Sequence, residues 1–255
     1  MNIGILQGRL SPPNGGFQEF PKDWKKEFVL AEELGLNHID WLVTKNCSYH
    51  SNPIFNEDLS KLNINSICAD NLISKRIISP DFLFNNLLQI CVSAIKNNIY
   101  SITIPLLEES GISDVPFRKA FIDNMNNFAI TYYPEITFSF EIESYEDAIS
   151  DVLDSNPNFR LTYDTGNMTS LGISHEYYLD KFSDRIDNIH LKDRTYEGNT
   201  VWPGSGKTDF GKIFEIMSDK QDLKYTIQTD RGSNGEEYKT IEKHFNYFNK
   251  FWRKR

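Results

Sequence analysis

Residues 159–194 of the chain read FRLTYDTGNMTSLGISHEYYLDKFSDRIDNIHLKDR. Two short runs in this stretch, 159–164 and 186–191, are rich in apolar and β-branched residues, as expected for strands that are buried on both faces. Each run ends in polar residues, among them Asp164 and His190. Two strands joined by a longer helical segment predict a parallel α/β fold.

The same alternation extends along the whole chain. Eight candidate strands lie at residues 2–7, 38–42, 64–69, 101–106, 135–141, 159–164, 186–191 and 224–228. With 255 residues this is about 32 residues per repeat, which fits a single (β/α)8 TIM barrel over residues 1–255. A doubly wound sheet needs fewer strands, and the first turn carries no GxGxxG motif.

Helix signals fall between the candidate strands. Residues 24–34 have helical spacing and end at Gly35, and Ser79-Pro80 opens a helix that continues through Ile95. Three further helix signals are a capping box at Ser144 and Asp147, a cap at Thr208 for residues 210–217, and a last helix over 239–252.

Composition excludes several classes of protein. Hydrophobic residues make up 39% and aromatic residues 13% of the chain, which excludes intrinsic disorder. The net charge of −9 gives no general attraction for nucleic acid or an anionic membrane, and no apolar run approaches the roughly 18–20 residues that span a bilayer. The start of the chain lacks signal-peptide features, and Cys47, Cys68 and Cys91 lack CxxC spacing. We therefore expect reduced thiols and a cytoplasmic protein.

Polar residues end the predicted strands, and in a TIM barrel these ends form the active-site rim. Glu141, Asp164 and His190 are separated by 23 and 26 residues, close to one βα repeat each. Two carboxylates and one imidazole suit a divalent ion such as Mn²⁺, Mg²⁺, Co²⁺ or Zn²⁺. The Gly204-Ser-Gly-Lys207 segment lacks P-loop spacing and is either a flexible turn or a backbone-amide nest for an oxyanion.

The sequence resembles the sugar phosphate isomerase/epimerase superfamily, or xylose-isomerase-like barrels. This superfamily includes the ketohexose 3-epimerases and, more distantly, the endonuclease IV type of DNA repair enzyme. The resemblance rests on GILQGRLSP (4–12), SICAD (66–70), YDTGN (163–167), IHLKDR (189–194) and IQTDRG (227–232). It implies a divalent metal held by Glu, Asp, His and Glu. Five scattered histidines and the negative charge argue against a role in DNA repair.

The implied metal ligands are Glu141, Asp164 and His190, with Gln228 at the fourth position, where the epimerases have a second Glu. An amide oxygen can bind a metal, but it cannot abstract or return a proton. Glu141 is therefore the predicted base, and Asp230, a water or Asp70 would take the second acid/base role. The candidate substrate-binding residues are Gln7, Arg9, Asp70, Asn167, Lys192 and Arg194.

The leading hypothesis is a metal-dependent isomerase or epimerase that acts on a small-molecule sugar or sugar phosphate. Gln228 keeps two alternatives open, which are a non-catalytic sugar-binding barrel and a metal-dependent lyase or hydrolase that uses a single base. We expect an anionic group of the substrate at Arg9, Arg194 or the Gly204–Lys207 loop. No nucleic-acid or membrane partner is expected, and a homo-oligomer is left open.

Overall fold

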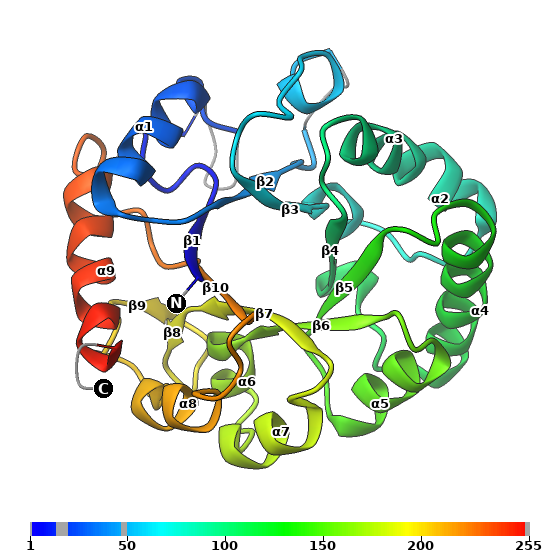
Figure 1. The fold of residues 1–255 in the computed structure, drawn as a ribbon. Coiled ribbons are helices and arrows are strands. Elements are labelled where there is room, and N and C mark those ends of the chain that lie inside the picture. The colour runs from blue at the N-terminus through cyan, green and yellow to red at the C-terminus, as the bar shows by residue number, and fades with distance from the viewer. Residues whose placement is uncertain (1, 14–19, 47–49, 253–255) are drawn as a thin grey trace. The chain divides into compact units, whose positions relative to one another are not determined.

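The structure confirms the predicted barrel. The computed structural model describes residues 2–13, 20–46 and 50–252, and eight strands close in the order β1-β10-β7-β6-β5-β4-β3-β2 (Figure 1). These strands are β1 (Asn2–Leu6), β2 (Ile39–Leu42), β3 (Ile64–Cys68), β4 (Ser101–Leu106), β5 (Thr137–Ile142), β6 (Arg160–Asp164), β7 (Ile186–Leu191) and β10 (Lys224–Ile227). Every boundary lies within two residues of its prediction. The fold class is the (β/α)8 TIM barrel.

Helices alternate with the barrel strands. The α-helices are α1 (Trp24–Leu34), α2 (Pro80–Asn86), α3 (Leu88–Lys96), α4 (Val115–Tyr132), α5 (Glu146–Ser155), α6 (Thr165–Ser170), α7 (His175–Phe182), α8 (Phe210–Ile216) and α9 (Glu237–Trp252). Three 3-10 turns, η1 (Pro53–Phe55), η2 (Asp70–Leu72) and η3 (Glu108–Ser110), complete the connections. A short antiparallel pair, β8 (Asp193–Arg194) with β9 (Thr200–Val201), was not predicted.

Two of the helix signals are confirmed. Gly35 ends α1 in the left-handed conformation at φ 79°, which glycine adopts without steric cost. The Ser79 hydroxyl caps α2 by accepting a bond from Phe82 N at 3.3 Å. The helix predicted to continue through Ile95 is instead two helices that meet at the buried Leu87, where φ is −102° and ψ is −31°.

The other two predicted caps are wrong. Helix α5 begins after Tyr145 and not at Ser144, and Asp147 pairs with Arg118 Nη2 at 3.0 Å. Helix α8 is capped by Asp209, whose Oδ1 accepts a bond from Lys212 N at 3.0 Å. Thr208, the residue predicted for this cap, uses its hydroxyl in a buried contact described below.

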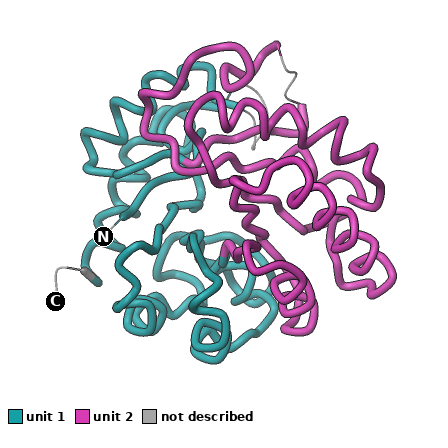
Figure 2. The backbone as a smooth tube through the Cα atoms, turned by 45° about the vertical axis from the view of Figure 1, so that its right-hand side comes forward, with its two compact units in different colours: residues 1–39, 163–255 teal, residues 40–162 magenta. Residues whose placement is uncertain are grey.

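The chain divides into two compact units (Figure 2). The first comprises residues 1–39 and 163–255. Within it β10 pairs in parallel with both β1 and β7, and Phe210 of α8 packs edge to face against Phe248 of α9. The second comprises residues 40–162, in which β3, β4 and β5 pair in parallel. The one-domain assignment stays a prediction.

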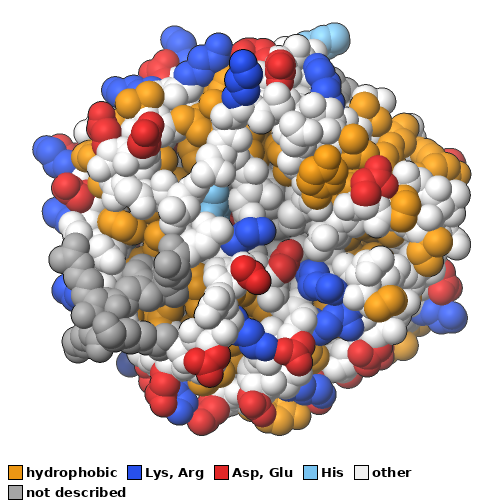
Figure 3. Space-filling view, in the orientation of Figure 1, with side chains coloured by type: hydrophobic (Ala, Val, Ile, Leu, Met, Phe, Trp, Pro, Cys, Tyr) orange, Lys and Arg blue, Asp and Glu red, His pale blue; other side chains and the backbone are white. Residues whose placement is uncertain are grey.

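Lys and Arg side chains are intermixed with Asp and Glu on the face seen in Figure 3. Within the described ranges, no helix is both long and apolar enough to cross a membrane. Cys68 and Cys91 are buried thiols, whereas Cys47 lies outside the described residues.

Glu27 of α1 fixes the loop that follows β1. Its carboxylate is 1% exposed and accepts bonds from Gly8 N at 2.7 Å, Leu10 N at 3.1 Å and Ser11 N at 3.0 Å. The Ser11 hydroxyl adds a fourth bond at 2.9 Å. Burial raises the pKa of Glu27, and these donors oppose that shift by favouring the ionised form. One side chain therefore holds the loop that carries Arg9.

We expect Glu27→Ala to lower the free energy of unfolding by about 3 kcal/mol or more, because several buried N–H groups lose their acceptor. Glu27→Gln, which keeps one oxygen, should lose less. The exposed Glu32→Ala on the same helix is the control and should change stability by less than about 0.5 kcal/mol. Urea unfolding measures all three variants, and equal losses at both positions would contradict the assignment.

Candidate metal and substrate site

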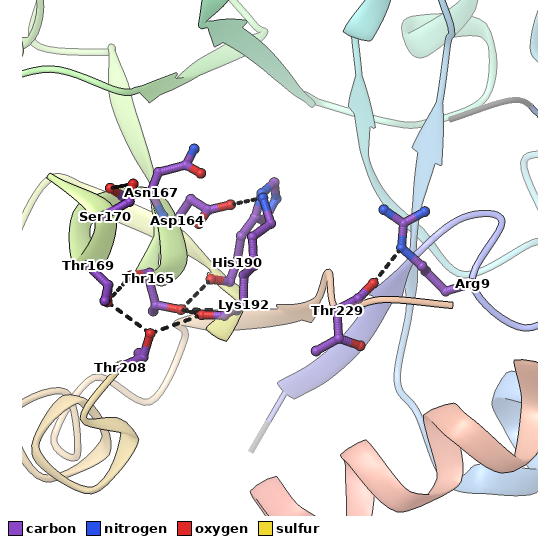
Figure 4. Close-up of polar contacts among 10 residues, drawn as sticks. All are labelled: Arg9, Asp164, Thr165, Asn167, Thr169, Ser170, His190, Lys192, Thr208 and Thr229. Atoms are coloured by element: carbon purple, nitrogen blue, oxygen red, sulfur yellow. Dashed lines mark hydrogen bonds and ion pairs between the residues drawn. The ribbon is translucent and has the colours of Figure 1, made fainter. Parts of the chain in front are cut away.

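Asp164 joins the end of β6 to the start of α6. Its Oδ1 accepts a bond from Asn167 N at 2.8 Å, which caps the helix, and its Oδ2 lies 2.6 Å from Lys192 Nζ (Figure 4). Burial by itself would raise the pKa of Asp164, but Lys192 and the nearby His190 hold that pKa below its usual value. The carboxylate is therefore ionised and oriented at both oxygens.

Thr165 fixes the end of β7 against the start of α6. Its Oγ1 accepts a bond from Lys192 N at 3.0 Å and lies 2.7 Å from the Lys192 carbonyl oxygen (Figure 4). A Cβ at Gly166 would come within 2.9 Å of Lys192 Cγ. A residue without a side chain at this position therefore allows Lys192 to reach Asp164.

His190 and Gln228 end neighbouring strands of the first unit. His190 is fully buried on β7, and β10 pairs with it through Thr226. Gln228 N donates to the carbonyl oxygen of Leu191 at 3.1 Å, so the amide side chain follows directly after the paired register. Among the described residues, the buried Gln228 Oε1 has no hydrogen-bond partner.

These residues fit a divalent metal. Glu141 on β5 of the second unit is buried, as are Asp164 and His190, and each of the three offers one ligand atom. The unsatisfied amide oxygen of Gln228 adds an uncharged oxygen ligand, a type that binds hard cations. Lys192 does not exclude a metal at Asp164, because a carboxylate has about four acceptor positions.

The glycine-rich loop is not a nest for a substrate anion. The Asp193 carboxylate already accepts bonds from Gly204 N at 2.8 Å, Gly206 N at 2.9 Å and Thr208 N at 3.1 Å. A Cβ at Gly206 would lie 2.2 Å from Asp193 Oδ1. The predicted amide cradle therefore exists, but the protein's own carboxylate fills it. Of the three anion sites expected, Arg9 and Arg194 remain predictions.

The other predicted residues lie in different surroundings. Arg9 is buried and donates from Nε to the carbonyl oxygen of Thr229 at 3.0 Å (Figure 4). Gln7 and Asn167 are buried in the first unit, while Asp70 opens η2 in the second. The geometry thus brings Asp164, His190, Lys192 and Asn167 together, and it leaves the roles of the remaining candidates as predictions.

Asp230 belongs to a cluster that the sequence did not reveal. Its Oδ1 lies 3.6 Å from Nε2 of the buried His244, whose Nδ1 is 2.7 Å from Thr229 Oγ1. Trp202, 44% exposed, meets His244 edge to face at 4.9 Å. A cavity of about 840 Å³ opens between Trp202, Asp230 and the start of α9. No local motif links these residues, because they come from separate segments of the chain.

Comparison with known proteins identifies the family. The model of the family described as "Xylose isomerase-like TIM barrel" matches residues 101–243, which is more than half of the chain. The chain therefore belongs to the xylose isomerase-like TIM barrel family. No curated protein sequence matches this chain at a significant level.

Solved structures share the fold at low identity. The IOLI protein with a binding zinc atom is 14% identical with a TM-score of 0.69, over 99% of this chain and 96% of its own. The 3-keto-D-glucoside 4-epimerase from E. coli is 16% identical with a TM-score of 0.71, over 98% and 99%. A D-psicose 3-epimerase from Clostridium cellulolyticum H10, solved with D-tagatose, is 14% identical with a TM-score of 0.72, over 98% and 99%. Identities this low establish the fold alone.

His244 predicts a loss of stability in acid. Burial lowers the pKa of His244 to about 4, against roughly 6.5 in the unfolded chain. The unfolded state therefore binds more protons as the pH falls through 6.5, so stability present at pH 7 is lost toward pH 4. We expect this residue alone to cost about 2 kcal/mol between pH 7 and pH 5.

Urea unfolding at both pH values tests this expectation. His244→Gln, which cannot titrate, should show a pH-dependent loss smaller by that amount. The exposed His50→Gln is the matched control and should keep the pH dependence of the wild type. An unchanged pH dependence in His244→Gln would show that His244 titrates normally in the folded protein.

Proposed function

We propose that this protein is a divalent-metal-dependent isomerase or epimerase of a sugar or sugar phosphate, and that it moves a proton at the carbon next to a carbonyl. The observation that carries the proposal is the buried set of Glu141, Asp164 and His190 at the ends of successive barrel strands. Family membership supports it, as do the solved epimerases that share the fold.

Asp164, His190 and Glu141 would hold the metal, with the Gln228 amide oxygen as a fourth donor. A bound divalent metal would polarise the substrate carbonyl and its neighbouring hydroxyl. Glu141 would remove the proton from the adjacent carbon, and Asp230 or a water would return it. The residues proposed to bind the substrate are Gln7, Arg9, Asp70, Asn167, Lys192 and Arg194.

Gln228 favours a second candidate, a reaction that needs only one base. The amide oxygen can bind a metal, but it has no proton to give and no basic lone pair at neutral pH. The carboxylate of Asp230, two residues further along, faces His244 at 3.6 Å. A metal-dependent lyase or hydrolase on this scaffold would need Glu141 alone, and a sugar-binding barrel would need no base.

His190→Ala should lower metal affinity by more than the 10–100-fold typical of changes beyond the ligands themselves, because it removes a ligand. Calorimetric titration with Mn²⁺, Co²⁺ and Zn²⁺ measures this effect directly. His50→Ala removes an exposed histidine and should bind as the wild type does. Undiminished affinity in His190→Ala would refute the metal site.

Gln228→Glu should convert one-sided proton exchange into epimerisation. The wild type, incubated in deuterated water with ketohexoses and their phosphates, should exchange the proton next to the carbonyl faster than it forms the epimer. Restoring a carboxylate should raise the ratio of epimer to exchange by roughly 100-fold, the scale of a general acid/base. Gln221→Glu, an exposed site, is the control for charge.

Three outcomes separate the candidates. Efficient epimerisation by the wild type, with no gain in Gln228→Glu, would show that another residue is the second base. Turnover that Glu141→Gln abolishes identifies an enzyme. Sugar binding without exchange or turnover, in the wild type and in Gln228→Glu alike, would leave the non-catalytic binding barrel.

A further inference from the structure

His175 connects three elements beside the proposed metal site. It is the first residue of α7, and its Nδ1 lies 2.8 Å from Oη of Tyr163, the β6 residue before Asp164. Its Nε2 lies 2.9 Å from Oγ1 of Thr169 on α6, the helix that Asp164 caps. The rings of Tyr163 and His175 meet edge to face with centroids 5.9 Å apart.

Hydrogen bonds continue from Thr169 toward the strand ends. The Thr169 hydroxyl donates to the carbonyl oxygen of Thr165 at 2.8 Å and lies 2.8 Å from Thr208 Oγ1 (Figure 4). Thr208 Oγ1 in turn reaches the carbonyl oxygen of Lys192 at 3.4 Å. Thr169 therefore connects His175 to the backbone of Thr165, the residue after Asp164, and to the side chain of Thr208.

The hydrogen bond that Thr169 donates to Thr165 indicates one tautomer for His175. Because a hydroxyl has one proton, a Thr169 hydroxyl that donates to Thr165 accepts from His175 Nε2–H. His175 Nδ1 is then an acceptor for the Tyr163 hydroxyl. Burial lowers the pKa of His175 to about 4, so its imidazole is neutral at neutral pH.

We propose that His175 is a positioning residue of the metal site. Its imidazole links Tyr163, on the strand that ends at Asp164, to Thr169 on the helix that follows, and so fixes the position of the Asp164 carboxylate, which would hold the metal. The inference rests on the metal site proposed above. Partners that orient metal ligands typically contribute 10–100-fold to metal affinity.

His175→Phe keeps an aromatic ring and removes both nitrogen contacts, so we expect the dissociation constant for Mn²⁺ to rise about 10–100-fold. His175→Gln places an amide N–H near the Nε2 position and should recover part of this loss. His175→Asn reaches only the Nδ1 position and should not. The exposed His50→Phe is the matched control and should bind Mn²⁺ as the wild type does.

A double-mutant cycle separates positioning from general destabilisation. Thr169→Val should weaken Mn²⁺ binding to a similar degree, and adding His175→Phe to it should cause little further loss, because both changes break the same link. Additive losses of affinity would overturn the proposal. So would unchanged affinity in His175→Phe, or losses that vanish once affinity is corrected for the measured folded fraction.

Imidazole ¹⁵N shifts of the metal-free protein test the link without any metal. The proposal requires a neutral Nε2–H ring at pH 6, and an imidazolium or an Nδ1–H tautomer would overturn it. If the wild type binds no Mn²⁺, Co²⁺ or Zn²⁺, the metal site itself fails and the positioning role fails with it. Metal binding by the wild type together with the wrong tautomer overturns the role of His175 alone.

Discussion

The two hydrogen bonds of the Asp164 carboxylate determine the arrangement of the site. One oxygen accepts from the first turn of α6, and the other holds the Lys192 ammonium, so the strand, the helix and the next strand end meet at one side chain. A buried charge is tolerated only with such partners. Gly166 and Thr165 both support the Asp164–Lys192 ion pair. Gly166 leaves space for the Lys192 side chain, and Thr165 fixes the Lys192 backbone.

The first βα loop follows the same principle with a different carboxylate. Glu27 accepts hydrogen bonds from several backbone amides of residues 8–11. Arg9, in the same loop, donates a hydrogen bond to the backbone that follows β10. Buried acids thus serve as acceptors for loops that have no regular structure of their own. In each case the carboxylate replaces the backbone partners that a helix or sheet would provide.

The barrel could be predicted from the sequence because most of the strands are short apolar or β-branched runs that recur at regular intervals. Asp164 and His190 could be placed for the same reason, since they close two such runs. The helix caps at Ser144 and Thr208 were wrong because a neighbouring residue, in each case one position later, ends the preceding loop. Adjacent residues compete for the N-cap position, and the pattern of residue types does not show which of two neighbours will occupy it.

The contacts of His175, His244 and Asp193 could not be predicted. Their partners lie 6 to 15 residues away along the chain and sit in turns whose course depends on the finished fold. The β8–β9 pair is only two residues long on each strand, too short to show an alternating pattern. Contacts between side chains on loops can be identified only when the three-dimensional course of those loops is known.

Asp193 also bears on how glycine-rich loops are interpreted in other chains. Its carboxylate is covalently attached 11 residues before the first amide that it binds, so it meets those amides at a high effective concentration, of millimolar order for short flexible tethers. A free phosphate would have to outcompete a ligand that never diffuses away. When an acidic residue precedes such a loop on the same chain, the loop can therefore bind that carboxylate and remain insensitive to free phosphate, although its geometry is that of an anion site.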